Sequence, residues 1–165
     1  MSQNITDQFI AALHQAEASG DPNPLAALFA ADSECTNLAK EAPETGVDGA
    51  RKFWGDYLKS FQQVKSEFFN VIKADDHAVL EWTSTGTLPG GKPIKYRGVS
   101  VLQYAGDKVK RFHTYYDSAA FVAAPATAEP AAPGAANTSA RQGTPEPAKG
   151  SGGSSFTAVE PNTAG

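Results

Sequence analysis

Apolar residues at the start of the chain recur at intervals of three and four, the spacing of one face of an α-helix. This stripe consists of Ile5, Phe9, Leu13 and Ala16. Gly20 follows it, and glycine commonly ends a helix. A short second helix is expected after the Asp-Pro-Asn-Pro sequence at 21–24, reaching Phe29. A third helix is predicted from Asp48 to about Gln63, where large apolar residues fill one broad face.

After the third helix the hydrophobic period changes to two, which is typical of strands. Strands are expected at about 66–74, 78–88, 93–105 and 108–117. Turn-forming residues occupy each gap: Asp-Asp, Pro-Gly-Gly and Gly-Asp. A shorter strand is predicted at 33–38 and a loop at 40–46. Helices followed by hairpin-linked strands indicate an α+β domain, in which a curved antiparallel sheet wraps three N-terminal helices and encloses a pocket.

The composition of the chain changes near residue 123. Residues 1–123 hold nearly all aromatic and branched apolar side chains, whereas 124–165 consist mostly of Ala, Pro, Gly, Ser and Thr. Such a segment cannot bury enough apolar surface to offset the entropy of ordering it. We therefore expect one folded domain at 1–123 and a disordered tail at 124–165.

Charge and cysteine content narrow the classes of partner. The net charge is −4, with 14 basic and 18 acidic residues, and no basic face is apparent, which argues against nucleic acid as a partner. The first residues contain no signal-peptide core and no apolar run spans a membrane, so a cytoplasmic location is expected. The three histidines, His14, His77 and His113, lack metal-ligand spacing. Neither a metal nor another cofactor is predicted, and Cys35 is expected to be a buried thiol.

Several segments, in unbroken order over about 5–122, resemble the nuclear transport factor 2-like superfamily. They are Leu28-Phe29-Ala30-Ala31-Asp32, then Gly46 leading into Ala50-Arg51-Lys52-Phe53-Trp54. Trp82-Thr83-Ser84-Thr85-Gly86-Thr87 and Tyr115-Tyr116-Asp117 are typical of its SnoaL-like branch. The resemblance implies a conical fold with a deep pocket for a small apolar ligand, and a homodimer formed through the sheet. The residues expected at the pocket are Phe29, Asn37, Trp54, Tyr57, Trp82 and Ser100.

The superfamily includes ketosteroid isomerases, which need a carboxylate base and an oxyanion hole made by a tyrosine and a neutral carboxyl group. At the corresponding positions this sequence has Asn37 for the base, Ser100 for the second carboxyl and about Leu13 for the tyrosine. An asparagine cannot accept a proton at neutral pH. The steroid isomerase mechanism is therefore not expected.

Polyketide cyclases of the SnoaL type use an aspartate at the end of the last strand as acid and base, a position that Asp117 matches. Strand alternation puts one row of side chains on a single face, directed at the pocket if Val109 faces inward. The row is Val109, Arg111, His113, Tyr115 and Asp117. The hypothesis is that Asp117 transfers a proton next to a carbonyl, in an isomerisation or aldol-type cyclisation, with His113 and Tyr115 orienting it or the substrate. A histidine common on the preceding strand of the cyclases is absent from 94–104.

Four alternatives bear on this hypothesis. Asp117 precedes Ser118 and would also serve as the N-cap of a short helix. A β-bulge anywhere in 108–117 would reverse the face on which the row lies. The Asp-Arg-Asp site of epoxide hydrolases is disfavoured because Glu81 shares its face with Val79. The rival function is a non-catalytic ligand-binding or dimerisation module, which a filled interior would favour over an open one.

Overall fold

The computed structural model describes residues 4–122. The helices are α1 (Ile5–Ser19), α2 (Asn23–Ala26) and α3 (Gly46–Lys59), with a short 3-10 helix η1 (Ser118–Phe121). The strands are β1 (Phe29–Asn37), β2 (Glu44–Thr45), β3 (Gln63–Lys73), β4 (His77–Thr87), β5 (Pro93–Ala105) and β6 (Lys108–Tyr116). The α+β architecture is the predicted one. The tail predicted at 124–165 lies outside the described residues, and the domain boundary near 123 stays a prediction.

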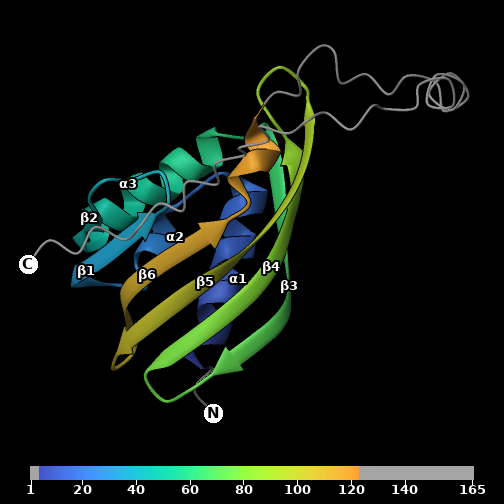
Figure 1. Cartoon of the computed structure of the whole chain (residues 1–165). Coiled ribbons are helices and arrows are strands. Elements are labelled where there is room, and N and C mark those ends of the chain that lie inside the picture. Colours follow the sequence, from blue (N-terminus) through green and yellow to red (C-terminus); the bar gives the residue numbers. More distant parts are fainter. Residues whose placement is uncertain (1–3, 123–165) are drawn as a thin grey trace, which may run out of the picture. The chain divides into compact units, whose positions relative to one another are not determined.

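All six strands form one curved sheet in the order β2-β1-β6-β5-β4-β3. Figure 1 shows β3 to β6 curving around α1, with α3 beside β1. Neighbouring strands are antiparallel except β1 and β6, which run in parallel. The sheet is therefore mixed, and the prediction of a purely antiparallel sheet is wrong at this pair. Strand β1 follows two helices instead of a hairpin, so the turn geometry that forces an antiparallel neighbour is absent there.

The boundaries of two predicted helices differ from the structure. Helix α2 ends at Ala26, and Phe29, expected in that helix, is the first residue of β1, where it pairs with Val109 of β6. Helix α3 ends at Lys59 instead of about Gln63, because Gln63 already pairs with Thr87 in the hairpin of β3 and β4. The four hairpin strands begin and end within three residues of their predicted bounds.

Both ends of α1 are fixed by capping. The side chain of Asn4 accepts a 2.8 Å hydrogen bond from the backbone N–H of Thr6. At the other end Gly20 has φ 76°, a left-handed conformation that glycine adopts without steric cost, and its N–H donates to the carbonyl of Ala16 at 2.7 Å. Capping fixes where α1 begins and ends, and so fixes which of its side chains face the sheet.

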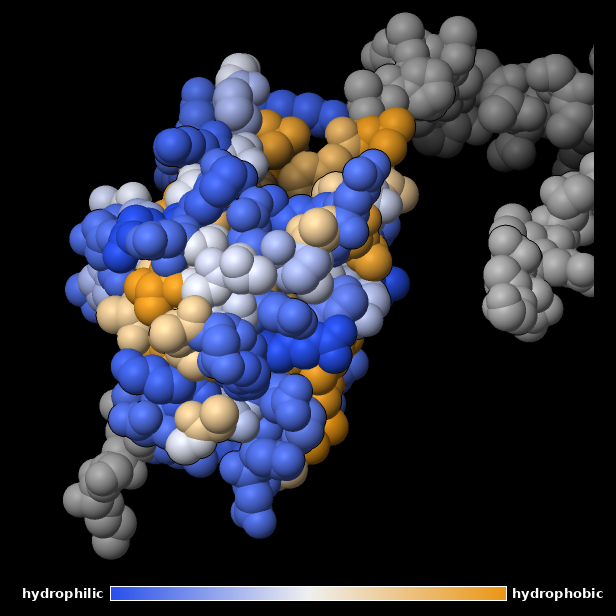
Figure 2. Space-filling model, turned by 90° about the vertical axis from the view of Figure 1, so that its left-hand side faces the viewer, coloured by the Kyte–Doolittle hydropathy of each residue, from blue (hydrophilic) through white to orange (hydrophobic). Residues whose placement is uncertain are grey.

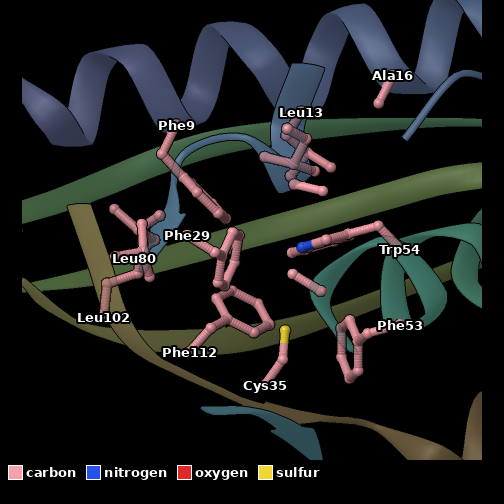
Figure 3. Close-up of a cluster of buried hydrophobic side chains, with 14 of the residues drawn as sticks. Phe9, Leu13, Ala16, Phe29, Cys35, Phe53, Trp54, Leu80, Leu102 and Phe112 are labelled. Carbon is pink, nitrogen blue, oxygen red and sulfur yellow. The ribbon is translucent and has the colours of Figure 1, made fainter. Parts of the chain in front are cut away.

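The core lies between α1, α3 and the concave face of the sheet, and aromatic rings dominate it (Figure 3). The Trp54 ring lies 4.9 Å from the Phe112 ring and 5.9 Å from the Phe9 ring, measured between centroids. Cys35 is fully buried beside them, as predicted. These rings hold two helices and the last strand in one packed unit, which makes the concave face a rigid wall.

Within residues 4–122, every helix is too short or too polar to cross a membrane. The cytoplasmic location expected from the sequence stays a prediction.

Candidate functional site

A cavity of about 450 Å³ lies between the concave face of the sheet, α1 and α3. Half of its lining residues are aromatic: Phe9, Phe53, Trp54, Tyr57, Phe61, Phe68, Trp82, Tyr96, Phe112, Tyr116 and Phe121. The other lining residues are Leu13, Asn37, Ala39, Lys40, Asp56, Ser60, Ser66, Ser84, Leu88, Ser100 and Thr114. Figure 2 shows hydrophobic side chains in a hollow near its upper edge. A cavity of this size suits a small organic ligand.

Five of the six residues expected at the pocket line this cavity: Asn37, Trp54, Tyr57, Trp82 and Ser100. Phe29 does not, and its placement at the pocket is wrong. It is 1% exposed and packs edge-on against Phe9, which lines the cavity in its place. Asn37 accepts a hydrogen bond from the backbone N–H of Ala39 through Oδ1, so its amide oxygen is already engaged.

The prediction that one row of side chains on the last strand lies on the inner face of the sheet is correct for Val109 but wrong for the residues after it. The register between β5 and β6 shifts at Lys110: Tyr104 pairs with Val109, but Gln103 pairs with Arg111. The extra residue is a β-bulge, and a shift of one residue turns the following side chains to the opposite face. The inward residues after the bulge are Phe112, Thr114 and Tyr116, all lining the cavity.

Arg111, His113 and Tyr115 consequently lie on the outer face of the sheet, where they line a depression of about 120 Å³ with His77, Val101 and Gln103. The rings of His113 and Tyr115 stack with their centroids 4.3 Å apart. Burial, helped by the charge of Arg111, lowers the pKa of His113. The structure therefore brings these residues together, but separates them from the large cavity.

Asp117 is exposed and is not among the cavity-lining residues. Its Oδ1 accepts a 3.2 Å hydrogen bond from the backbone N–H of Ala119, and it is the N-cap of η1. The capping role raised as an alternative is thus confirmed. A catalytic role for Asp117 stays a prediction.

Polar groups in the cavity are joined by short hydrogen bonds that run along the sheet. The indole N–H of Trp82 donates to Oγ of Ser100 at 2.9 Å, and this hydroxyl donates to Oγ1 of Thr114 at 2.9 Å. The indole nitrogen of Trp54 is buried and has no hydrogen-bond partner among residues 4–122.

A second network centres on Glu17 of α1. Oε1 of Glu17 accepts hydrogen bonds from the hydroxyls of Tyr57, at 2.8 Å, and Ser66, at 2.6 Å. Oε2 accepts the backbone N–H of Ser66 at 2.9 Å. The hydroxyls of Ser66 and Ser84 lie 2.6 Å apart. The carboxylate thus stands directly behind the cavity wall, and its partners form that wall.

The two tyrosines near this network keep their protons at neutral pH. Burial is the main reason that the pKa of Tyr57 is raised, and the charge of Glu17 adds to the effect. Burial also raises the pKa of Tyr96 to about 12. Both phenols therefore act as hydrogen-bonding groups in the cavity and not as bases.

Sequence reasoning missed Glu17, although a signal exists. Glu17 lies four residues after Leu13 and eight after Phe9, so it extends the buried stripe of α1. A carboxylate at the end of an apolar stripe, with Ala16 marking the same buried turn, indicates an acidic group against the core.

At the cavity rim, charged groups are paired with each other. Nζ of Lys40 lies 2.8 Å from Oε1 of Glu44, which also contacts Lys52 at 3.0 Å. Hydrogen bonds from Lys40 and then Lys52 lower the pKa of Glu44. Asp56 is paired with Lys52 at 3.0 Å. Within residues 4–122, no group of three or more His, Cys, Asp or Glu side chains is placed to hold a metal.

Crystal structures with the same fold are numerous. One, from Catenulispora acidiphila, has a ketosteroid isomerase-like fold and contains trimethylamine; it is 23% identical, with a TM-score of 0.62, covering 68% of this chain and 88% of that one. An NTF2-like protein from Anabaena variabilis is 21% identical, with a TM-score of 0.63; the match covers 69% of this chain and 87% of that one. TerC, co-crystallised with polyporic acid, is 16% identical, with a TM-score of 0.61; the match covers 72% of this chain and 95% of that one.

A search of curated protein sequences found no match. The model of the SnoaL-like domain matches residues 9–112, which include most of α1, all of α3 and most of the sheet. This span contains most residues that line the cavity, Glu17 and the two residues that bond to it, Tyr57 and Ser66. The resemblance seen in the sequence is confirmed, and the chain belongs to the SnoaL-like domain family of NTF2-like proteins.

Proposed function

We propose that the protein binds a small, mainly apolar ligand in the cavity between the sheet, α1 and α3. The single observation that carries this proposal is the cavity itself, about 450 Å³ and lined half by aromatic residues. An interior filled by its own side chains would have favoured a module without a ligand. Two proteins of the same fold are described with small molecules, trimethylamine and polyporic acid.

Intrinsic fluorescence offers a direct test, because both tryptophans of the chain, Trp54 and Trp82, line the cavity. Titration with isobutylbenzene should change their emission saturably. Ala39→Phe adds a ring at the exposed rim and should weaken this binding. Ala105→Phe, at an exposed hairpin position away from the cavity, is the matched control and should bind as the wild type does. Equal weakening in both variants, or no saturable change in the wild type, would refute the proposal.

The isomerase or cyclase reaction expected from the resemblance stays a prediction. Proton transfer next to a carbonyl needs an acid or base that reaches the ligand. Asp117, His113 and Tyr115 do not line the cavity, while Glu17 reaches it through the hydroxyls of Tyr57 and Ser66. We therefore base the proposal on ligand binding and place any proton transfer second to it.

We also propose that two copies associate through the outer face of the sheet, as the family resemblance implies. Apolar side chains are contiguous there, because Val79 pairs with both Ile72 and Val101, and Val99 pairs with Tyr115. Ile72 and Tyr115 are 56% and 46% exposed. Light scattering should give the mass of a dimer for the wild type and of a monomer for Val101→Lys. A monomeric wild type at high micromolar concentration would exclude the dimer.

A further inference from the structure

We propose that the cavity selects apolar ligands that carry a protonated amine, which donates its N–H to hydroxyl oxygens at the Glu17 end. This inference rests on the proposed ligand-binding function and specifies the chemical class of the ligand. It follows from the direction in which the hydroxyl protons of the Glu17 network must point, from the unpaired charge behind them, and from the aromatic walls.

The protons of the network all point toward Glu17. A carboxylate only accepts hydrogen bonds, so the hydroxyls of Tyr57 and Ser66 each donate their only proton to Oε1 of Glu17. The contact of 2.6 Å between Ser66 and Ser84 still requires a proton, and Ser66 has none left. Ser84 must therefore be the donor in that contact.

Tyr57 and Ser84 line the cavity with no proton left to donate, and both also form hydrogen bonds with the Tyr96 hydroxyl, which must therefore donate its proton to one of them. The hydroxyl oxygens at this end of the cavity consequently offer lone pairs to a ligand. A ligand group that meets these oxygens has to donate a hydrogen bond. A carbonyl, carboxylate or ether oxygen placed there would face another acceptor, and a buried acceptor without a donor is costly. The polar end of the cavity thus favours hydroxyl and amine ligands over carbonyl compounds.

The charge of Glu17 favours an amine among these donors. Glu17 has no ion pair with any Lys, Arg or His of residues 4–122. His14 lies nearby, but its Nε2 contacts the carbonyl oxygen of Ser66 at 2.9 Å, not the carboxylate. Lys40, at the rim, is paired with Glu44. Glu17, half-buried behind the cavity wall, therefore has no protein cation beside it, and a ligand cation would balance its charge.

The walls suit a cation as well. Aromatic faces attract ammonium groups when the cation lies within about 6 Å of a ring centroid. Tyr57 packs edge-on against Trp54, with centroids 5.6 Å apart, and Tyr96 packs against Trp82 at 5.4 Å. An ammonium group bonded to the Tyr57 or Ser84 oxygen would therefore lie among rings whose faces carry negative charge, while its apolar substituents fill the rest of the cavity.

A set of nearly isosteric probes separates these contributions at pH 7. N,N-dimethylbenzylamine, protonated at this pH, has the shape of isobutylbenzene but carries a charge and an N–H donor. Benzyltrimethylammonium keeps the charge without the donor, and phenylacetate carries acceptors and a negative charge. By tryptophan fluorescence, the amine should bind most tightly and phenylacetate most weakly. Phenylacetate binding as tightly as the amine would overturn the proposal. Benzyltrimethylammonium binding as tightly as the amine would overturn the assigned N–H donation.

Variants test whether Glu17 is the group that makes the cavity selective for the amine. Glu17→Gln should weaken dimethylbenzylamine binding by about tenfold or more, the usual size of a lost hydrogen bond or contact with a charge. It should change isobutylbenzene binding by less than about twofold. Glu67→Gln is the matched control: it removes an exposed carboxylate on the outer side of β3, away from the cavity, and should leave the amine affinity unchanged.

Should Glu17→Gln not fold, Ser84→Ala removes an acceptor oxygen with a smaller change and should likewise weaken only the amine. Unchanged amine affinity in the folded variant, or an equal loss in Glu67→Gln, would overturn the inference while leaving the proposed function intact. Loss of isobutylbenzene binding by the wild type would instead refute the proposed function.

Discussion

The hydroxyl of Tyr57 donates a 2.8 Å hydrogen bond to Oε1 of Glu17, which lies 40 positions earlier in the chain. This bond connects α3 to α1, and the bonds of Ser66 to the same carboxylate connect both helices to β3. The group that gives the cavity its polarity therefore also holds its walls together. Changes at this point should alter both stability and ligand selection.

Tyr57→Phe should lower the free energy of unfolding by about 1–2 kcal/mol, because it removes a hydrogen bond to a charged group. Tyr116→Phe is the matched control, since Tyr116 lines the same cavity but its hydroxyl has no hydrogen-bond partner among residues 4–122. The control should stay within about 0.5 kcal/mol of the wild type. Urea unfolding measures both, and equal losses would show that the Tyr57 hydroxyl contributes nothing specific.

Gly98 of β5 is one of the glycines in residues 4–122 that leave no room for a side chain. A Cβ there would collide with the carbonyl oxygen of Tyr115 and with the ring of Trp82. We expect Gly98→Ala to destabilise the protein by about 1–3 kcal/mol through overpacking. Gly55→Ala, in α3, meets only a van der Waals contact with Pro22 and should stabilise by roughly 0.5–1 kcal/mol. Thermal unfolding that moves in the same direction for both variants would contradict this account of the close approach.

Two substitutions at Asp117 separate capping from proton transfer. Asp117→Ala removes the cap of η1 and should cost about 0.5–2 kcal/mol of stability, while Asp117→Asn keeps a capping oxygen and should cost little. Ligand affinity should be unchanged in both, because Asp117 does not line the cavity. The catalytic prediction would be supported instead if Asp117→Asn, fully stable, abolished turnover of a substrate that the wild type converts.

His113 should make the protein less stable as the pH falls. Its pKa is lowered in the folded state, so the unfolded chain binds the proton more readily. The stability of the wild type should therefore decline as the pH drops below the ordinary histidine value of about 6.5. Urea unfolding at pH 7 and pH 5 should show a smaller decline for His113→Gln. Arg111→Gln should reduce the decline partly, since Arg111 is the secondary cause of the shift. Identical pH profiles for all three proteins would contradict the burial of His113 on the outer face.

The hairpin strands were predictable because turn residues mark each gap and each strand alternates. Strand β5 has the predicted bounds, 93–105. The β-bulge at Lys110 could not be predicted from the sequence, because a lysine is common at exposed strand positions. In the structure Lys110 forms an ion pair with Asp32 of β1, and its hydrogen bond lowers the pKa of that carboxyl. The contact joins residues 78 positions apart, and local patterns do not report such pairings.

The candidate site, like the strands, was predictable only in part. Trp54 and Tyr57 were expected at the cavity because they share the apolar face of α3, and the structure places them there. Phe29 was expected at the pocket from the family resemblance, but pairing of β1 with β6 places it behind Phe9, which lines the cavity instead. Glu17 was missed because a single acidic residue near a helix end usually faces solvent. Only the positions of Tyr57 and Ser66 give it a partner.

Locating a bound ligand would test the central claim most directly. Crystals of the wild-type protein can be soaked with bromobenzene, and the bromine found by its anomalous scattering. Our account predicts the strongest peak inside the cavity, between the rings of Trp54, Tyr57 and Trp82. Peaks confined to the outer face of the sheet, with the cavity empty, would contradict it.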